Sequence, residues 1–458
     1  MKKAALICIA LLLLSCIQSQ DMVSPTALLI TDVNIVDLRK GTILEHRYIV
    51  IDSGLIKSIT TGIDQPQLYS QKIDGKGQYL LAGLAEMHAH IPSPPTSPTR
   101  VEETLFLYLS NGITTIRGML GHPSHLELRK SALKGELLSP RIFSSSPSLN
   151  GNSVQTVEEA QQKVTAYAQA GYDFLKIHPG IRLDVFNALA ETARQEEIPF
   201  AGHVPVDVGI IKALESGYAT IDHIDGFLEG LVPADKIGDP NENGFFGYNF
   251  TALADTTRIS ELVELSKQKE IWIVPTQSLF ERWFAPTTAD EMLGQPEMKY
   301  MPLATLQNWR ARKVQATGDQ SGFDPDNWET FIDIRRKLIR SIQDNGHGLL
   351  LGSDAPQIFN VPGFSIHREI EGMVRAGLSP LEILRSGTIN VARYLDMEGR
   401  IGEIKVGFEA DALLIRHNPL IDLAALREIQ GVLVRGRWIP KEEIDRRLKE
   451  IEDNAAKQ

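Results

Sequence analysis

The sequence predicts an α/β protein whose main body is a TIM (β/α)8 barrel, joined to a small β-sandwich domain that both chain ends form. Three observations predict this fold. Eight apolar or β-rich segments occur along the chain, stretches of helical periodicity follow them, and further β-rich segments stand at both ends. Alternating strands and helices are typical of parallel βα units, and eight strands close such a barrel. The 458 residues are enough for a barrel of ~250 residues and a second domain.

The composition is that of an ordinary globular protein, with 43% hydrophobic and 23% charged residues. The formal net charge is -11, and the sequence shows no basic stripe. Nucleic-acid binders need clustered lysine and arginine to displace counterions from phosphate. The sequence therefore predicts no nucleic-acid partner.

Residues 1–16 have the anatomy of a secretion signal. Two lysines precede an apolar run, residues 4–14, that is too short to span a bilayer comfortably. The run leads into Leu13-Leu14-Ser15-Cys16, which resembles the lipobox of bacterial lipoproteins, whose cysteine is acylated. We therefore expect lipidation of Cys16, a tether over residues 17–26, and export to a membrane anchor in the bacterial cell envelope, in the periplasm or at the outer membrane. The alternative is a plain signal peptide with an incidental Cys16.

The cysteines support the same expectation. The chain has two of them, Cys8 inside the signal and Cys16 itself. The remaining residues carry no thiol, so the sequence predicts no disulfide framework.

Short β-rich segments separated by turn signals stand at both ends of the chain beyond the tether. Asp52-Ser53-Gly54 is one such turn, and Arg435-Gly436-Arg437 supplies a hairpin turn near the other end. We expect residues 27–80 and 399–440 to form one β-sandwich domain around the barrel segment. Two unrelated β pieces are the alternative.

Residues 81–398 carry the predicted barrel. Its helices show their own end signals: Thr156 and Glu159 have the capping-box spacing at the start of a helix over 156–171, which ends on glycine. The eight strand candidates are residues 79–90, 112–119, 141–149, 173–178, 199–204, 220–225, 271–277 and 349–354.

Two connections, residues 227–270 and 279–344, are much longer than the others, and both leave the carboxyl ends of their strands. Active sites of (β/α)8 barrels lie on that face. The insertions either roof a pocket or form an extra helical layer on the barrel rim, and both can be true at once. A final helix or tail is expected over residues 441–458. The aromatic residues of the insertions include Phe245, Phe246, Tyr248, Trp283, Phe284, Trp309 and Trp328.

A set of metal-ligating residue types stands at the ends of the strand candidates. His88 and His90 are two apart at the end of the first strand, so their side chains point to the same face and can chelate zinc or a similar metal. His203 ends the fifth candidate, His223 ends the sixth, and Asp354 ends the eighth. Four imidazoles and a carboxylate on one rim would need partners, which a metal supplies. The sequence therefore predicts a metal centre at the barrel mouth.

This order of residues, with Lys176 at the end of the fourth strand, resembles that of the amidohydrolase superfamily. The resemblance covers residues 27–440 and includes the segments 112–117, 377–382 and 402–412. Within the superfamily the chain is most similar to imidazolonepropionase-like and prolidase-like members, which cleave peptide or N-acyl bonds. The resemblance implies a metal-dependent amidohydrolase, with a β-sandwich made from both chain ends.

Lys176 occupies the position at which binuclear members carry a carboxylated lysine. The resemblance then implies that His88, His90 and Asp354 bind one metal, and that His203 and His223 bind the other, with Lys176 bridging two zinc ions. Asp354 would act as general base and acid towards a metal-bridged hydroxide and the leaving amine. The alternative is a buried Lys176 paired with a carboxylate inside the barrel, which leaves a mononuclear site.

Two residues are candidates for substrate binding. His178 lies two residues beyond Lys176 and so on the same strand face, where it either contacts the substrate carbonyl or carboxylate or hydrogen-bonds to a ligand. Arg117, at the end of the second strand, could clamp a substrate carboxylate through two hydrogen bonds. Many relatives carry an aspartate directly after this arginine, whereas this chain has Gly118.

Three functions are compatible with these observations. The first is a binuclear hydrolase of amide bonds in dipeptides or N-acyl amino acids, that is, a dipeptidase, carboxypeptidase or N-acyl amino acid hydrolase. The second is a mononuclear amidohydrolase that acts on cyclic amides or amidines. The third is an anchored binding protein that has kept the barrel and lost catalysis, which the complete ligand set disfavours. Expected partners are a small-molecule or short-peptide substrate, the membrane, and a second copy of the chain in a homo-oligomer.

Overall fold

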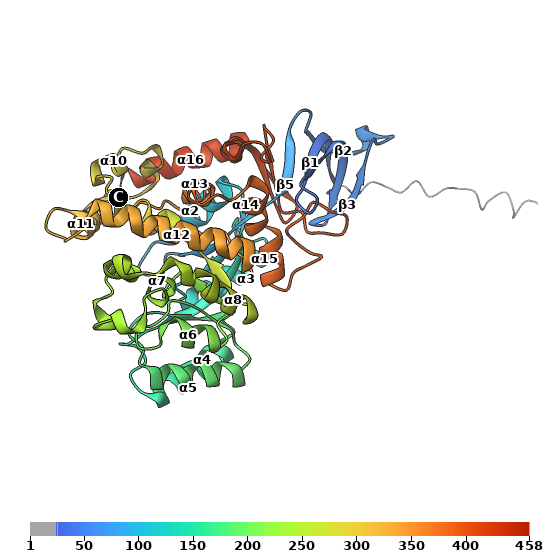
Figure 1. Cartoon of the computed structure of the whole chain (residues 1–458). Helices are drawn as coiled ribbons and strands as arrows, with labels where there is room; N and C mark the ends of the chain where they lie inside the picture. The colour runs from blue at the N-terminus through green and yellow to red at the C-terminus, as the bar shows by residue number, and fades with distance from the viewer. Residues whose placement is uncertain (1–23, 25, 458) are drawn as a thin grey trace, which may run out of the picture.

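The computed structural model describes residue 24 and residues 26–457 (Figure 1). The predicted signal, Cys16 and most of the tether lie outside the described residues. Among the described residues, no helix combines the length and the apolar character needed to cross a membrane.

Seven parallel strands build the barrel, as expected for βα units. They follow one another in the order β12-β11-β10-β9-β8-β7-β6, so each strand pairs with its neighbour in sequence. This sequential order is usual for parallel strands whose connecting helices cover the sheet. The strands are β6 (Leu84–Ala89), β7 (Ile113–Gly118), β8 (Arg141–Leu149), β9 (Phe174–Ile177), β10 (Phe200–Gly202), β11 (Thr220–Asp222) and β12 (Trp272–Val274).

The eighth strand expected over residues 349–354 is not a regular strand, which corrects that prediction. The segment still closes the barrel, through isolated bridges from Leu349 to Ile273 of β12 and from Ala355 to Ala89 of β6. Its regular pairing is interrupted because a side chain takes over one backbone hydrogen bond. The Ser353 amide donates to Glu86 Oε1 at 2.6 Å.

The first strand candidate, residues 79–90, is divided between two sheets, which is a second correction. Its first part, β5 (Tyr79–Ala82), belongs to the other domain, and β6 begins after Gly83. A Cβ at Gly83 would lie 2.1 Å from Thr114 Oγ1, so only glycine fits at this crossing point. The Gly83 amide donates to Asp411 O at 2.9 Å, which fixes the change of sheet.

Both ends of the chain join in one mixed sheet, as predicted. Its order is β15-β14-β13-β5-β1-β2-β3, with β4 paired to β1. The ends meet where β13 pairs antiparallel with β5, for example Leu413 with Leu81. Figure 1 shows this sheet at one end of the molecule. Its remaining strands are β1 (Leu28–Asp37), β2 (Thr42–Asp52), β3 (Leu55–Thr60), β4 (Gln71–Asp74), β13 (Ala412–Ile415), β14 (Ile429–Val434) and β15 (Arg437–Pro440).

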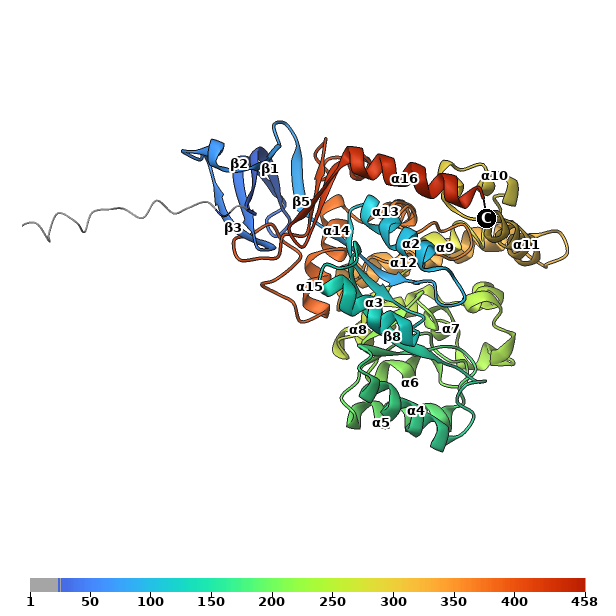
Figure 2. The same ribbon diagram turned by 180° about the vertical axis from the view of Figure 1, so that it is seen from behind.

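The end signals predicted for the helix near residues 156–171 are present in α4 (Val157–Ala170). The Thr156 side chain accepts from the Glu159 amide in a capping box, and Gly171 ends that helix with a φ of 80°. Figures 1 and 2 show α16 running from the mixed sheet along the molecule towards α10. The helices before the first insertion are α2 (Pro98–Ser110), α3 (Pro123–Leu133), α4 (Val157–Ala170), α5 (Leu183–Gln195) and α6 (Gly209–Glu215).

The two insertions are mainly helical. The second insertion ends in the long helix α12, whose apolar side is buried against the barrel. The later helices are α7 (Phe227–Gly230), α8 (Ile259–Gln268), α9 (Gln277–Phe280), α10 (Ala289–Leu293), α11 (Leu303–Thr317), α12 (Pro325–Asn345), α13 (Ser365–Arg375), α14 (Pro380–Ser386), α15 (Ile389–Tyr394) and α16 (Lys441–Ala455). Four 3-10 segments lie in the first insertion: η2 (Ala234–Lys236), η3 (Pro240–Glu242), η4 (Phe245–Leu253) and η5 (Thr256–Arg258).

Candidate metal centre

Three of the expected ligands form a compact cluster at the end of β6. The ligand atoms of His88, His90 and Asp354 all lie within 4.8 Å of one another. His90 Nε2 lies 2.8 Å from Asp354 Oδ1, and His88 Nε2 lies 3.6 Å from the same oxygen. His88 and Asp354 are buried, and His90 is half-buried, so one side of the cluster stays open to the barrel mouth.

The other imidazoles continue this cluster around the rim. The ring centroids of His88 and His223 are 4.5 Å apart, and those of His223 and His203 are 4.6 Å apart. His178 stacks on His203 at 5.0 Å. The structure therefore brings together every histidine that the sequence assigned to the site, in one row from β6 to β9.

The backbone at these strand ends is held in an uncommon conformation. His223 has a φ of 65° and Asp354 a φ of 63°, and Thr276 beside them has a φ of 44°. Residues with side chains rarely adopt such positive φ values, at a cost of about 1–3 kcal/mol each, and these cases concentrate at functional sites. The strands end at this point, which turns the side chains towards the barrel axis.

Hydrogen bonds behind the imidazoles set their orientation. His203 Nδ1 lies 3.0 Å from Asp225 Oδ2, a carboxylate that can only accept, so Nδ1 carries the proton and Nε2 keeps a free lone pair. His223 Nδ1 lies 2.8 Å from Thr276 Oγ1. Partners of this kind accompany metal-binding histidines in proteins, because they fix the ring and its tautomer.

Burial keeps the imidazoles in the neutral form that binds a metal. It lowers the pKa of His88 well below the ordinary value, and the nearby charge of Lys176 lowers it further. Burial also lowers the pKa of His223, with His88 as the next cause. A divalent cation therefore meets ligands that need not lose a proton first.

Lys176 lies on β9 with its side chain fully buried. Within the described part of the chain its Nζ has no hydrogen-bond partner and forms no ion pair. The carboxylate-paired lysine considered from the sequence is thus not formed. Burial lowers the pKa of Lys176 to about 8, because the charged amine loses its hydration. Among the described residues this buried amine has no partner, and its charge lowers the pKa of three imidazoles, those of His88, His178 and His223. Its uncharged form is compatible with a site that holds cations.

Arg117 does not reach the barrel mouth, so the structure gives no support to its expected role as a carboxylate clamp. It is fully buried inside the barrel, where its Nη2 donates to Asp222 Oδ1 at 2.9 Å. Its other nitrogens donate to Met87 O, Thr220 Oγ1 and Tyr394 Oη. A guanidinium with all three nitrogens engaged is available to the fold rather than to a substrate.

Several supporting residues were missed by sequence reasoning. Glu86 is buried beneath the cluster and accepts hydrogen bonds from the amides of His88 and Ser353. Asp222 and Asp225 flank His223, and the spacing of these two carboxylates around a strand-end histidine was the available signal. Arg335 of α12 donates to the carbonyl oxygens of His223 and Pro275, which no sequence pattern indicates.

The insertions both roof the site and add a helical layer. The Phe246 ring lies 5.7 Å from His203 and 5.4 Å from His223, centroid to centroid. Behind it, the rings of Phe245 and Phe284 stack at 4.6 Å. Phe331 of α12 packs on this aromatic layer, with its ring centroid 5.9 Å from that of Phe280 and 6.3 Å from that of Phe284. Figure 1 shows α11 and α12 as part of the helical layer that the second insertion adds.

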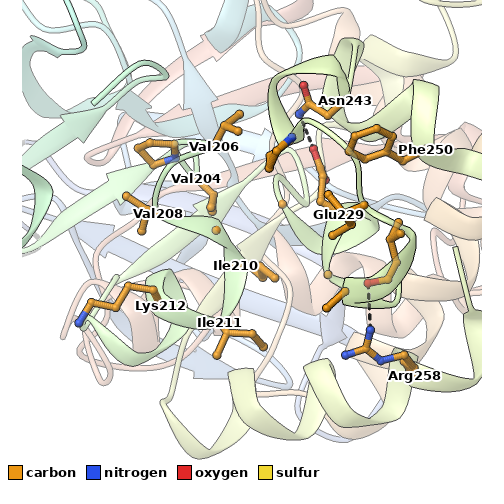
Figure 3. Close-up of a pocket in the computed structure, with 18 of the residues that line it drawn as sticks. Val204, Val206, Val208, Ile210, Ile211, Lys212, Glu229, Asn243, Phe250 and Arg258 are labelled. Atoms are coloured by element: carbon orange, nitrogen blue, oxygen red, sulfur yellow. Dashed lines mark hydrogen bonds between the residues drawn. The ribbon is translucent and has the colours of Figure 1, made fainter. Parts of the chain in front are cut away.

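A cavity of about 500 Å³ lies beside the metal centre, between α6 and the first insertion (Figure 3). Val204 and Gly226, which adjoin His203 and Asp225, line its inner wall. Most of its lining is apolar, and Glu229 is its buried acid, with the Asn243 amide donating to Glu229 Oε1 at 2.7 Å. Burial raises the pKa of Glu229 to about 7.

Comparisons with known proteins agree with this geometry. The model of the Amidohydrolase family matches residues 79–439. Ochratoxinase of Aspergillus niger is 22% identical over 439 residues, which cover 86% of this chain and 82% of that protein. A bottromycin amidohydrolase structure superposes with a TM-score of 0.71 at 21% identity, over 94% of this chain and 91% of that one. A putative prolidase from Bifidobacterium longum gives 0.63 at 23%, over 93% and 98%. The family match spans most of the chain, and the protein is therefore a member of the amidohydrolase family and a metal-dependent hydrolase.

Proposed function

We propose that this protein hydrolyses the amide bond of dipeptides or N-acyl amino acids at a binuclear metal centre. His88, His90 and Asp354 would hold one cation, His203 and His223 the other, and a carboxylated Lys176 would bridge them. The buried Nζ of Lys176, which has no hydrogen-bond partner in the part of the chain that the structure describes, is the observation that supports the bridge. The lowered pKa of about 8 supports it further, because the uncharged amine is the form that adds to carbon dioxide.

Divalent cations in this site, with zinc as the proposed metal, would supply Lewis-acid polarisation of the scissile carbonyl and acidify the attacking water. The chain itself supplies the proton transfer. Asp354 lies within the cluster, 2.8 Å from Nε2 of the half-buried His90, and its carboxylate would accept the proton of the attacking water and deliver it to the nitrogen of the broken C–N bond. His178 is half-buried beside His203, and Ser148 Oγ lies 2.7 Å from its Nδ1, which leaves Nε2 to contact the substrate carbonyl or carboxylate.

The main test of this proposal compares metal content and hydrolysis in the wild type and in Lys176→Ala. We expect about two metals per chain in the wild type, measured by elemental analysis, with cleavage of a panel of dipeptides and N-acyl amino acids. The variant should lose metal and activity together. The matched control is Lys313→Met, another buried lysine, which bonds to carbonyl oxygens in the second insertion and should leave the metal content unchanged.

A second candidate has one specific observation in its favour. The three residues His88, His90 and Asp354 already form a compact ligand group without Lys176. A mononuclear enzyme acting on cyclic amides or amidines would use this group alone. One metal per chain that survives Lys176→Ala, together with cleavage of cyclic amides, would establish this candidate instead of the bridged centre.

We also propose that the protein is exported and held at a membrane by acylation of Cys16, which rests on the lipobox-like segment. Fractionation of cells expressing the full chain tests this. The wild type should sediment with membranes and Cys16→Ser should be released to the soluble fraction. Equal membrane retention of both proteins would reject the anchor.

A further inference from the structure

Phe246 is the aromatic side chain of the first insertion that touches the metal centre. Its ring is tilted by 34° against His203 and stands nearly edge-on to His223. The side chain is only half-buried, so part of the ring remains accessible beside the two imidazoles. Phe246 therefore lies against the β10 and β11 side of the centre, where it could contact a group attached to a bound amide carbonyl.

The backbone of Phe246 is strained in a way that keeps the ring in this place. Its φ and ψ are 52° and 47°, a conformation that bulky residues rarely adopt, and Gly247 follows with a φ of 81°. Contacts on both sides hold the segment. Asn243 before it donates to Glu229, and the Tyr248 hydroxyl after it donates to Asp324 O at 2.7 Å. Strain maintained by surrounding contacts is typical of residues that serve a site.

A rigid aromatic layer supports the Phe246 ring from behind. Its centroid lies 4.8 Å from that of Phe245 and 5.0 Å from that of Phe280. Phe280 is in turn covered by the guanidinium of Arg335, whose Cζ lies 3.4 Å from the ring centroid. The Phe246 ring and the layer behind it, which together form one aromatic wall, therefore cannot rearrange easily. The accessible part of the Phe246 ring offers the offset or edge-on geometry that another aromatic ring prefers.

We propose that Phe246 is a specificity-determining residue and that the enzyme favours substrates with an aromatic side chain next to the scissile amide. This inference rests on the proposed amide-hydrolase function. The same 3-10 segment presents Phe250 to the separate cavity instead (Figure 3), so Phe250 offers a matched control. The cavity is the competing place for an apolar substrate group.

The test measures kcat/KM of the metal-loaded, full-length protein on dipeptides that carry Phe or Leu on either side of the amide. We expect the wild type to prefer Phe, and Phe246→Leu to reduce this preference about tenfold, since an aromatic pair contributes a gain of that order. Phe250→Leu should retain the preference, and both variants should retain the wild-type metal content. A preference unchanged in Phe246→Leu would overturn the proposal, as would a loss in Phe250→Leu, which would place the group in the cavity.

Two further measurements separate this inference from folding and from the proposed function. Phe246→Gly relieves the positive φ but also removes the packing of the ring, so it should melt lower than the wild type by no more than a moderate amount, retain the wild-type metal content and lose the aromatic preference. Calorimetric titration with 3-phenylpropionate and 4-methylvalerate, which contain no amide bond, measures binding at the same aromatic wall without turnover. The wild type should bind the aromatic acid more tightly than the aliphatic acid. Phe246→Leu should bind the two acids equally. If no dipeptide is cleaved, the proposed function fails, and equal binding of the two acids to the wild type would reject the Phe246 proposal by itself.

Discussion

Arg117 and Asp222 form an ion pair across the inside of the barrel, 2.9 Å apart and both fully buried. The second oxygen of Asp222 lies 3.0 Å from His88 Nδ1, although not in hydrogen-bonding orientation. The pair therefore connects three strands beneath the metal centre and faces one of its ligands from behind.

Asp222→Asn should cost both stability and metal affinity. Removing one charge leaves Arg117 buried and uncompensated, for which we expect a loss of about 3–5 kcal/mol in the free energy of unfolding. Loss of the carboxylate behind His88 should weaken metal binding about 10–100-fold. Denaturant unfolding and competition with a metal chelator measure the two effects. Asp184→Asn, in the exposed pair with Arg182, should leave stability and metal affinity close to those of the wild type, because water screens this pair. Similar losses in both variants would contradict the role of burial.

Arg335→Met should loosen the strand ends that carry His223. The guanidinium donates to His223 O at 2.9 Å and to Pro275 O at 3.1 Å, so its removal leaves two carbonyls without this partner. We expect a loss of about 2–4 kcal/mol in unfolding free energy, together with weaker metal binding. Lys337→Met on the exposed side of the same helix should change stability by no more than about 0.5 kcal/mol. Unaltered metal affinity in the Arg335 variant would show that these bonds do not position His223.

Gly202→Ala should disturb Lys176 directly. An added Cβ would lie 2.4 Å from Ile177 O and 3.1 Å from Lys176 Cδ, at a backbone φ of 126°. Gly217 also has a positive φ, of 88°, but no neighbouring atom of residues 24 and 26–457 lies within 4 Å of its Cβ position. We expect Gly202→Ala to lose about 1–3 kcal/mol more stability than Gly217→Ala, because only the former adds a clash. Metal content should fall in the first variant alone. Equal metal content in the two variants would contradict a tight fit around Lys176.

Glu369 should make stability depend on pH below neutrality. Burial raises its pKa from 4.5 to about 7, while its carboxylate accepts from the Ser278 amide at 2.7 Å. Between these values the folded protein keeps a proton that the unfolded chain releases, so the stabilisation is complete below pH 4.5 and is lost as the pH rises towards 7. Glu369→Gln should lose less stability than the wild type between pH 5 and pH 7, by at most about 1.4 kcal/mol per pH unit. Parallel stability curves, measured by denaturant unfolding, would rule this out.

The position of the candidate ligands at the barrel mouth could be predicted because it depends on local pattern. His88 and His90 share a face through the two-residue period of a strand, and His203, His223 and Asp354 follow strand candidates at the carboxyl end. The strand lengths were overestimated, since β10, β11 and β12 each have only three residues. The ligands stand at the point where pairing stops, and apolar pattern alone does not mark that point.

The role of Arg117 could not be predicted, because it depends on a partner 105 residues away in sequence. In the sequence, an arginine that binds a substrate carboxylate and one that pairs with a buried carboxylate have the same position at the end of a strand. Only the closed barrel shows that Asp222 lies opposite Arg117. The irregular eighth segment has a similar cause. Glu86 replaces a backbone partner of Ser353 across 267 residues, and no local pattern records that exchange.

The sequence by itself determined the alternation of strands and helices, the residues that face the metal centre and the joining of both chain ends in one sheet, because hydrophobic period and strand-end position are local properties. Tertiary structure alone decided which charged groups neutralise one another inside the barrel, that Lys176 has no partner among the described residues, and that Phe246 rests on His203 and His223. These relationships come from contacts between distant segments, whose geometry is set only when the barrel closes and the insertions pack over its mouth.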